Sequence, residues 1–92
     1  MDYKLLYEKI DSALLKCVDS NKTYIKFYGK QIQLYESMLQ NELKCKPPKF
    51  SKIAYSEWQK KVDSYIDKIT SFLIKIEEEF NEIYITTKEL NK

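Results

Sequence analysis

The sequence contains no histidine and no arginine, and it has only one glycine, two prolines and two cysteines among its 92 residues. Histidine is the side chain that acid–base catalysis at neutral pH uses most often, and catalytic triads depend on it. A single glycine also excludes a glycine-rich loop that could hold a phosphate. We therefore expect a protein that is not an enzyme, with no catalytic residues and no cofactor.

The remaining polar residues do not form a recognisable metal site. Cys17 and Cys45 have neither the C-x-x-C spacing nor a histidine partner of a zinc site. Glu77, Glu78 and Glu79 are adjacent, so on a helix their carboxylates point to different faces, and no histidine accompanies them as in di-iron bundles. We interpret the glutamate run as a solvated acidic face and expect no bound metal.

Several features bear on where the protein is found. The chain begins Met-Asp-Tyr-Lys without the apolar segment of a secretory signal, and no apolar run approaches the length of a membrane span. On one continuous helix Cys17 and Cys45 would lie roughly 40 Å apart, so free thiols in a reducing compartment are expected. We predict a cytoplasmic protein. Export without a cleavable signal, or synthesis inside an infected host cell, are the alternatives. The abundance of lysine, isoleucine, tyrosine and asparagine is typical of an AT-rich genome.

The chain reads as a single helical domain over residues 1–92, divided at its midpoint by Pro47-Pro48. Proline interrupts a helix and also disfavours helical geometry in the residue before it. We therefore predict a helix over about 2–45, a turn over 46–50 and a helix over about 51–90. Ser51 is expected to cap the second helix, with Phe50 packed against Tyr55 at its start. A capping box of Ser56 and Gln59, one turn later, is the competing start of the same helix.

Apolar residues recur at helical spacing in both halves of the chain. The first half carries two neighbouring rows. The first row is Leu14, Val18, Ile25, Tyr28, Ile32, Tyr35 and Leu39, and the second row is Leu6, Ile10, Ala13, Cys17, Tyr24, Phe27, Leu34 and Met38. The second half carries one stripe of Trp58, Val62, Ile66, Ile69, Leu73, Ile76, Phe80, Ile83 and Leu90, with Thr87 at its one polar position.

The segment from Asp19 to Thr23 is the one place where the first helix could break, because its residues favour caps and turns. The spacing of three and four nevertheless passes through Asn21 without a shift, which favours a continuous helix. A three-helix bundle with a break near Asn21 stays the alternative. Gly29 is either a tolerated helical glycine or a point at which another backbone approaches closely.

Folding the chain at the prolines pairs residues whose numbers add up to roughly 97. Leu39 then lies near Trp58, Leu14 lies near Ile83, and Asn21 faces Ile76. Two helices cannot cover apolar arcs of this width, so we expect a helical hairpin that forms a homodimeric four-helix bundle.

Positive charge gathers around the turn. Residues 46–61 contain five lysines and one acid, whereas residues 62–92 contain four lysines and seven acids. We name the lysines and aromatic residues of this region the basic tip and predict that it contacts a partner. Its members are Lys46, Lys49, Phe50, Lys52, Tyr55, Trp58, Lys60 and Lys61. The competing interpretation is that the aromatic rings fill the end of the core and the lysines only solubilise it.

In length and expected hairpin shape the chain resembles the WXG100 family, small secretion-system proteins whose hairpins dimerise into four-helix bundles. Its turn reads Pro47-Pro48-Lys49-Phe50 where that family has W-x-G, and its tryptophan lies in Trp58-Gln59-Lys60. The family's C-terminal tyrosine–acid signal is also missing, because Lys88 stands four residues after Tyr84. The resemblance implies a secretion-system partner or chaperone.

Three functions are therefore expected for such a protein. The first is a non-enzymatic adaptor that binds a larger protein, and the second is a phage- or plasmid-encoded inhibitor or immunity protein that blocks one. The third is a dimeric hairpin that binds nucleic acid, against which the net charge of +2 and the lack of arginine argue.

Overall fold

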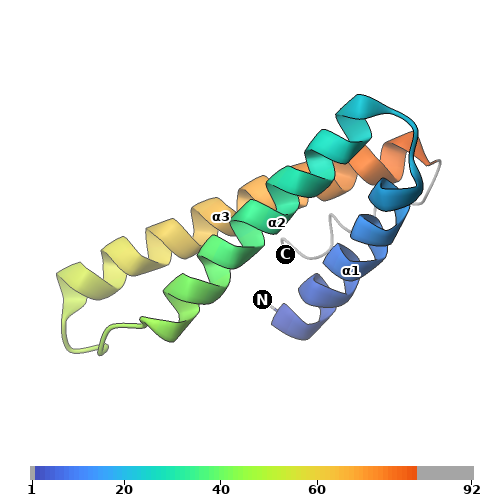
Figure 1. The fold of residues 1–92 in the computed structure, drawn as a ribbon. Coiled ribbons are helices and arrows are strands. Elements are labelled where there is room, and N and C mark those ends of the chain that lie inside the picture. The colour runs from blue at the N-terminus through green and yellow to red at the C-terminus, as the bar shows by residue number, and fades with distance from the viewer. Residues whose placement is uncertain (1, 81–92) are drawn as a thin grey trace.

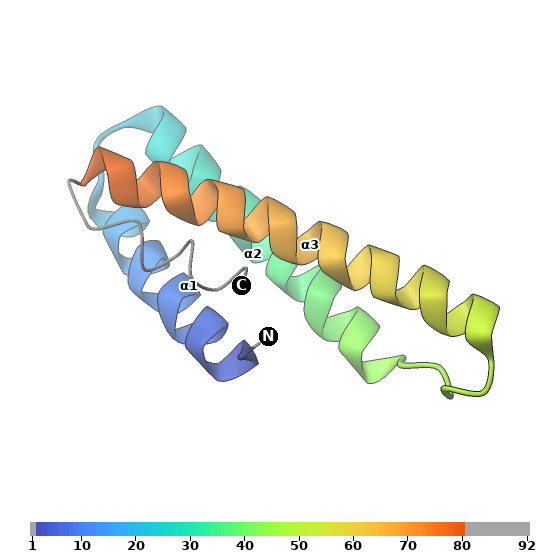
Figure 2. The same ribbon diagram turned by 180° about the vertical axis from the view of Figure 1, so that it is seen from behind.

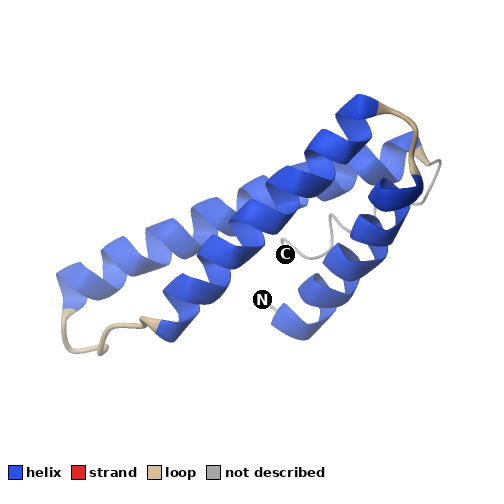
Figure 3. Cartoon of the chain, viewed as in Figure 1, coloured by secondary structure: helices blue, strands red, loops and turns tan. Residues whose placement is uncertain are grey.

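The computed structural model of the chain describes residues 2–80, which form three α-helices and no strand (Figure 1). The helices are α1 (Tyr3–Asp19), α2 (Thr23–Lys44) and α3 (Lys52–Glu79). Residues 20–22 connect α1 to α2, and residues 45–51 connect α2 to α3 (Figure 3). The all-α prediction is confirmed, and the three-helix alternative fits the structure better than a two-helix hairpin.

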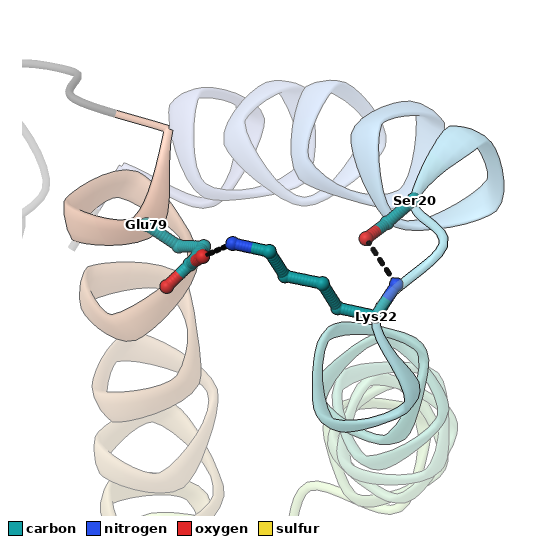
Figure 4. Close-up of polar contacts among 3 residues, drawn as sticks. All are labelled: Ser20, Lys22 and Glu79. Carbon is teal, nitrogen blue, oxygen red and sulfur yellow. Dashed lines mark hydrogen bonds and ion pairs between the residues drawn. The ribbon is translucent and has the colours of Figure 1, made fainter.

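The prediction of one continuous helix over about 2–45 is wrong, because the chain leaves helical geometry at Ser20. The backbone N–H of Lys22 donates to the Ser20 hydroxyl over 3.1 Å (Figure 4). The N–H of Ser20 donates to the Cys17 carbonyl. Short polar side chains offer the backbone such alternatives to helical hydrogen bonds. Asn21 is exposed in this connection and does not face Ile76 across a seam.

The break lets α1 fold back on α2, and each of these helices then buries a different apolar row. In α1 the second row is buried, through Leu6, Ile10, Ala13 and Cys17. In α2 the first row is buried, through Ile25, Ile32 and Leu39. Both rows therefore contribute to one core, each on its own helix.

The contact between α1 and α2 is closest at Gly29. A Cβ atom on Gly29 would lie 2.9 Å from the Cβ of Cys17 and 3.2 Å from its sulfur. Such distances leave no space for a side chain, so the glycine is required for the approach of the two helices. The close-approach interpretation of Gly29 is confirmed, and the approaching helix is α1 of the same chain.

Helices α2 and α3 form an antiparallel pair whose register differs from the expected one. The Tyr28 ring lies 5.6 Å from that of Phe72, Tyr35 lies 6.3 Å from Tyr65, and Trp58 hydrogen-bonds the Glu42 carbonyl. The numbers of the partners add up to 100 in each pair, not 97. The prediction placed the ends of both helices level with each other, whereas α3 begins about one turn farther out than α2 ends (Figure 1).

The predicted inner face of α3 is confirmed over its described length. The buried apolar residues of this helix are Trp58, Val62, Ile66, Ile69, Leu73 and Ile76. The helix ends at Glu79, with Phe80 as its C-cap, and not near residue 90 as expected. The predicted stripe positions Ile83, Thr87 and Leu90, and the pairing of Leu14 with Ile83, lie outside the described residues.

Helix α1 packs against both α2 and α3, but it is shorter than either of them, and the α2–α3 pair continues beyond the N-terminal end of α1 (Figures 1 and 2). The turn between α2 and α3 therefore stands at a free end of a molecule 48 Å long. In the described part of the chain, no helix has the length and apolar character needed to cross a membrane.

Candidate partner-binding surfaces

The basic tip is built by an extended stretch that carries the chain past the end of α2. Residues 46–48 are non-helical, and a turn follows in which the N–H of Ser51 donates to the Pro48 carbonyl over 3.1 Å. Two successive prolines hold this stretch extended because their rings fix the backbone. The first turn of α3 consequently projects beyond α2, with no residue of α2 opposite it.

Trp58 and Tyr55 hold the base of the tip together and do not offer their faces to a partner. The indole Nε1 of Trp58 donates to the Glu42 carbonyl over 2.7 Å, and the side chain is buried. The Lys46 ammonium lies 5.7 Å from the Trp58 ring centre and 5.9 Å from that of Tyr55. A cation over an aromatic face is attracted to it, so Lys46 fastens the turn to α3. Of the predicted site, these three residues therefore have a structural role.

Phe50 is 85% exposed and does not pack against Tyr55, so the predicted hydrophobic contact at the start of α3 is wrong. Ser51 is the N-cap, as expected, but its side chain makes no capping hydrogen bond. Ile53, which sequence reasoning missed, is 83% exposed beside Phe50. These are the two most exposed large apolar residues in the described part of the chain. Ile53 is exposed because the turn that carries it extends past α2.

The remaining lysines of the basic tip are exposed. Lys60 lies 3.8 Å from Glu57 on the same face of α3, whereas Lys49 and Lys52 flank Phe50 and Ile53 in the sequence. From Leu43 to Ser56 the chain contains four lysines and no acidic residue. The end of the molecule therefore combines positive charge with two exposed apolar side chains.

A second apolar surface lies on α2, on residues that the sequence assigned to the second row. Tyr24, Phe27, Leu34 and Met38 are exposed, because α2 turns its first row to the core. We call these four residues the outer row. Gln31 lies between them at the same helical spacing, so no charged residue interrupts the row.

Aromatic rings connect the outer row to α3. Phe27 and Tyr24 lie 6.2 and 6.0 Å from Tyr28, which contacts Phe72 of α3. Tyr35 lies 6.4 Å from Phe72 on the other side. The Lys75 ammonium is 5.5 Å from the rings of both Tyr28 and Phe72. The outer row is thus backed by a half-buried layer of aromatic residues and bordered by a lysine.

A third group of exposed apolar residues lies on α1, where Leu15 is 71% and Val18 is 76% exposed. Beside Val18 is a hollow of about 240 Å³ between α1 and α2. Its lining residues are Leu14, Cys17, Val18, Lys26, Gly29, Lys30 and Gln33. Leu15 and Val18 are less exposed than Phe50 and Ile53, and they lack the concentration of lysines that the tip carries.

An ion pair closes the opposite end of the molecule. Lys22, before the first residue of α2, bonds Glu79, the last residue of α3 (Figure 4). This hydrogen bond is the main cause that lowers the pKa of Glu79 and raises the pKa of Lys22, and Tyr24 contributes to both shifts. The pair links the connection between α1 and α2 to the end of α3.

The lowered pKa of Glu79 predicts how stability depends on pH. A carboxylate whose pKa is lower in the folded state stabilises the fold above its ordinary pKa of about 4.3 and loses this effect as the pH falls through the folded value. Glu79→Gln is therefore expected to be less stable than the wild type at pH 7, and the difference should vanish in acid. Urea denaturation between neutral and acidic pH measures this difference, and a constant difference would contradict the role of the ion pair.

Glu36 supplies a contrast of opposite sign. Burial raises its pKa, and the nearby Asp11 of α1 raises it further. Its ionised form is therefore disfavoured in the folded state, and this penalty disappears as the pH falls below the ordinary pKa. Glu36→Gln is expected to be more stable than the wild type at pH 7 and equal to it in acid.

Among residues 2–80, no group of three or more potential ligands is placed to hold a metal ion. Cys17 is buried and Cys45 is exposed, and both are free thiols. Comparison of the chain with known protein families, with curated proteins and with solved structures finds no match. The basic tip and the outer row are the two surfaces that physical reasoning identifies as candidates for binding.

Proposed function

We propose that this protein is a non-enzymatic helical module that binds other proteins, and that the outer row of α2 is its contact surface. The observation that carries the proposal is the exposure of Tyr24, Phe27, Leu34 and Met38 in a row without charge. Aromatic residues and methionine are enriched at the centres of protein interfaces, and charged residues are depleted there. The half-buried rings behind the row restrict its motion, which reduces the entropy lost on binding.

A second copy of the chain is the partner that suits this row best. A two-fold symmetric contact places each residue row against itself, so a charged row would meet a like-charged row. The outer row avoids this repulsion because it is uncharged. Two copies that contact each other along α2 place two α2–α3 pairs side by side. This arrangement resembles the four-helix dimer expected from the sequence, except that each copy also contributes α1.

We expect light scattering at tens of micromolar to give a mass of twice 11.1 kDa. Leu34→Lys should return the mass to that of one chain without loss of helicity, because an exposed position tolerates lysine in the monomer but not in an apolar contact. Burial of a leucine contributes about 1.5–3 kcal/mol, so a dissociation constant should rise by at least about tenfold.

Leu15→Lys is the matched control, because it makes the same change at an exposed leucine outside the outer row. This variant should keep the wild-type mass. A single-chain mass for the wild type at every concentration would exclude the second copy as the partner. Equal effects of both substitutions would exclude the outer row as the contact.

The adaptor, the secretion-system partner and the inhibitor or immunity protein all remain versions of this proposal, because each binds a protein through an exposed apolar surface. Binding of nucleic acid has less support. Trp58 is buried and so cannot stack on a base, and Tyr55 is half-buried with the Lys46 ammonium already over its ring.

A further inference from the structure

The basic tip has properties that a protein-binding role for the outer row does not explain. Its two most exposed apolar side chains are those of Phe50 and Ile53, which belong to the turn before α3 and to the first turn of that helix. Around them the chain carries four lysines and no acid between residues 43 and 56. We propose that this end of the protein binds the surface of an anionic lipid bilayer, with Phe50 and Ile53 inserted and the lysines at the level of the headgroups.

The charge of the tip is complementary to such a surface. Lysine clusters are attracted to anionic lipids over about a Debye length, which is about 8 Å at 0.15 M salt. Lys49 and Lys52 lie next to the apolar residues in the sequence, and Lys44 precedes the turn. Glu57 is the nearest acidic residue on the C-terminal side. Its carboxylate lies 3.8 Å from the Lys60 ammonium, and this positive charge offsets the repulsion between Glu57 and an anionic surface.

The apolar part of the tip suits a bilayer because it projects outward. Phe50 and Ile53 occupy the turn and the first turn of α3, which extend past α2 and past the N-terminal end of α1 (Figures 1 and 2). An open hollow lined by residues 50–54 lies beside them. Two projecting apolar side chains above a row of lysines can enter a soft interface, where the lysine stems extend to keep their charge in water.

The structure also prevents the tip from burying these side chains in its own core. Trp58 already fills the end of the core and is fixed by its hydrogen bond to the Glu42 carbonyl. Lys46 lies over the Trp58 ring and ties the start of the turn to α3. Pro47 and Pro48 add stiffness. Phe50 and Ile53 are therefore held outward before any surface is met, which lowers the entropy lost on insertion.

Co-sedimentation of the full chain with vesicles tests this inference. We expect binding to phosphatidylcholine vesicles that contain about 30% phosphatidylserine, and at least about tenfold weaker binding to phosphatidylcholine alone. The paired substitution Phe50→Ser with Ile53→Ser should weaken binding at least about tenfold because the inserted apolar area is lost. Lys49→Glu with Lys52→Glu should do the same and should reduce the effect of salt on binding.

Each variant has a control of equal chemical change elsewhere. Leu15→Ser with Val18→Ser removes two apolar residues of similar exposure from α1, and Lys26→Glu with Lys30→Glu reverses two exposed lysines of α2. Both controls should bind like the wild type. Circular dichroism must show equal helicity in all variants, and none of these substitutions involves a buried side chain.

A tryptophan at the tip distinguishes insertion from purely electrostatic adsorption. In Phe50→Trp, the added emission should shift to shorter wavelength with anionic vesicles, relative to the wild type with Trp58 alone. Failure of the wild type to bind either vesicle type would overturn the inference and leave an acidic protein as the partner of the tip. The inference would also be overturned if the control substitutions weakened vesicle binding as much as the tip substitutions do. Neither result changes the mass that light scattering measures, so the vesicle experiment and the test of the dimer can fail independently.

Discussion

Ile69→Asp is expected to unfold the protein. Ile69 is fully buried on the inner face of α3, and the neighbouring core positions of that face are buried as well. The substitution loses about 1.5–3 kcal/mol of apolar burial and adds an unpaired buried charge, which costs several kcal/mol more. Natural domains have only about 5–15 kcal/mol of stability, so the folded state should not survive. Circular dichroism at 25 °C, followed by a thermal melt, measures the loss of helix and of cooperativity.

Glu78→Lys is the matched control on the same helix, because Glu78 is exposed in the last turn of α3, one residue before the helix ends. Its melting temperature should stay within a few degrees of that of the wild type, as is usual for surface substitutions. Should Glu78→Lys destabilise the protein more than Ile69→Asp does, the inner face of α3 would be wrongly placed by at least one position.

Gly29→Leu is expected to displace α1 from α2. Even a Cβ at this position would lie 2.9 Å from the Cβ of Cys17, and neither atom belongs to the flexible end of a side chain. Overpacking of this kind costs about 1–3 kcal/mol, which exceeds the gain of about 1 kcal/mol from replacing a helical glycine. Because α1 is held by a small buried set of side chains, we expect its release and not a small adjustment.

The thiols report this displacement directly. In the wild type, Cys45 should react rapidly with a disulfide reagent, whereas Cys17 should react slowly because it is buried and burial raises its pKa. In Gly29→Leu both thiols should react rapidly. Gln40→Leu adds a leucine at an exposed position of α2 and should keep the wild-type pattern. Slow reaction of Cys17 in Gly29→Leu, with an unchanged melt, would contradict the proposed contact.

Much of the helical content was predictable because periodic apolar residues dominate the chain. The stripe on α3 was correct from Trp58 to Ile76, and the role of Gly29 was among the stated alternatives. The break at Ser20–Lys22 was harder to predict, because the apolar spacing continues through Asn21. The apolar spacing indicates which residues share a helix face. It does not reveal that α1 buries the second row in the core whereas α2 buries the first row.

The candidate surfaces were predictable only in part. Lysine clustering at the turn was visible in the sequence, but the exposure of Ile53 depends on α3 starting one turn beyond α2. That offset arises from the extended prolines and shifted the register by three residues. Likewise, the sequence places Tyr55, Trp58 and Phe50 near the same turn. The packing of the side chains then decides that Trp58 is buried, Tyr55 is half-buried and Phe50 is exposed.

The connection between α1 and α2 also determines how copies of this chain can exchange parts. Only Ser20, Asn21 and Lys22 separate the helices, and the apolar spacing allows them to join into one long helix. If the connection straightens, α1 can place Cys17 against Gly29 of another molecule and recover the same contacts between chains. Such domain-swapped dimers arise at short hinges, where little energy separates the closed and exchanged forms. A swapped dimer would keep its mass in Leu34→Lys, whereas a dimer joined along the outer row would not.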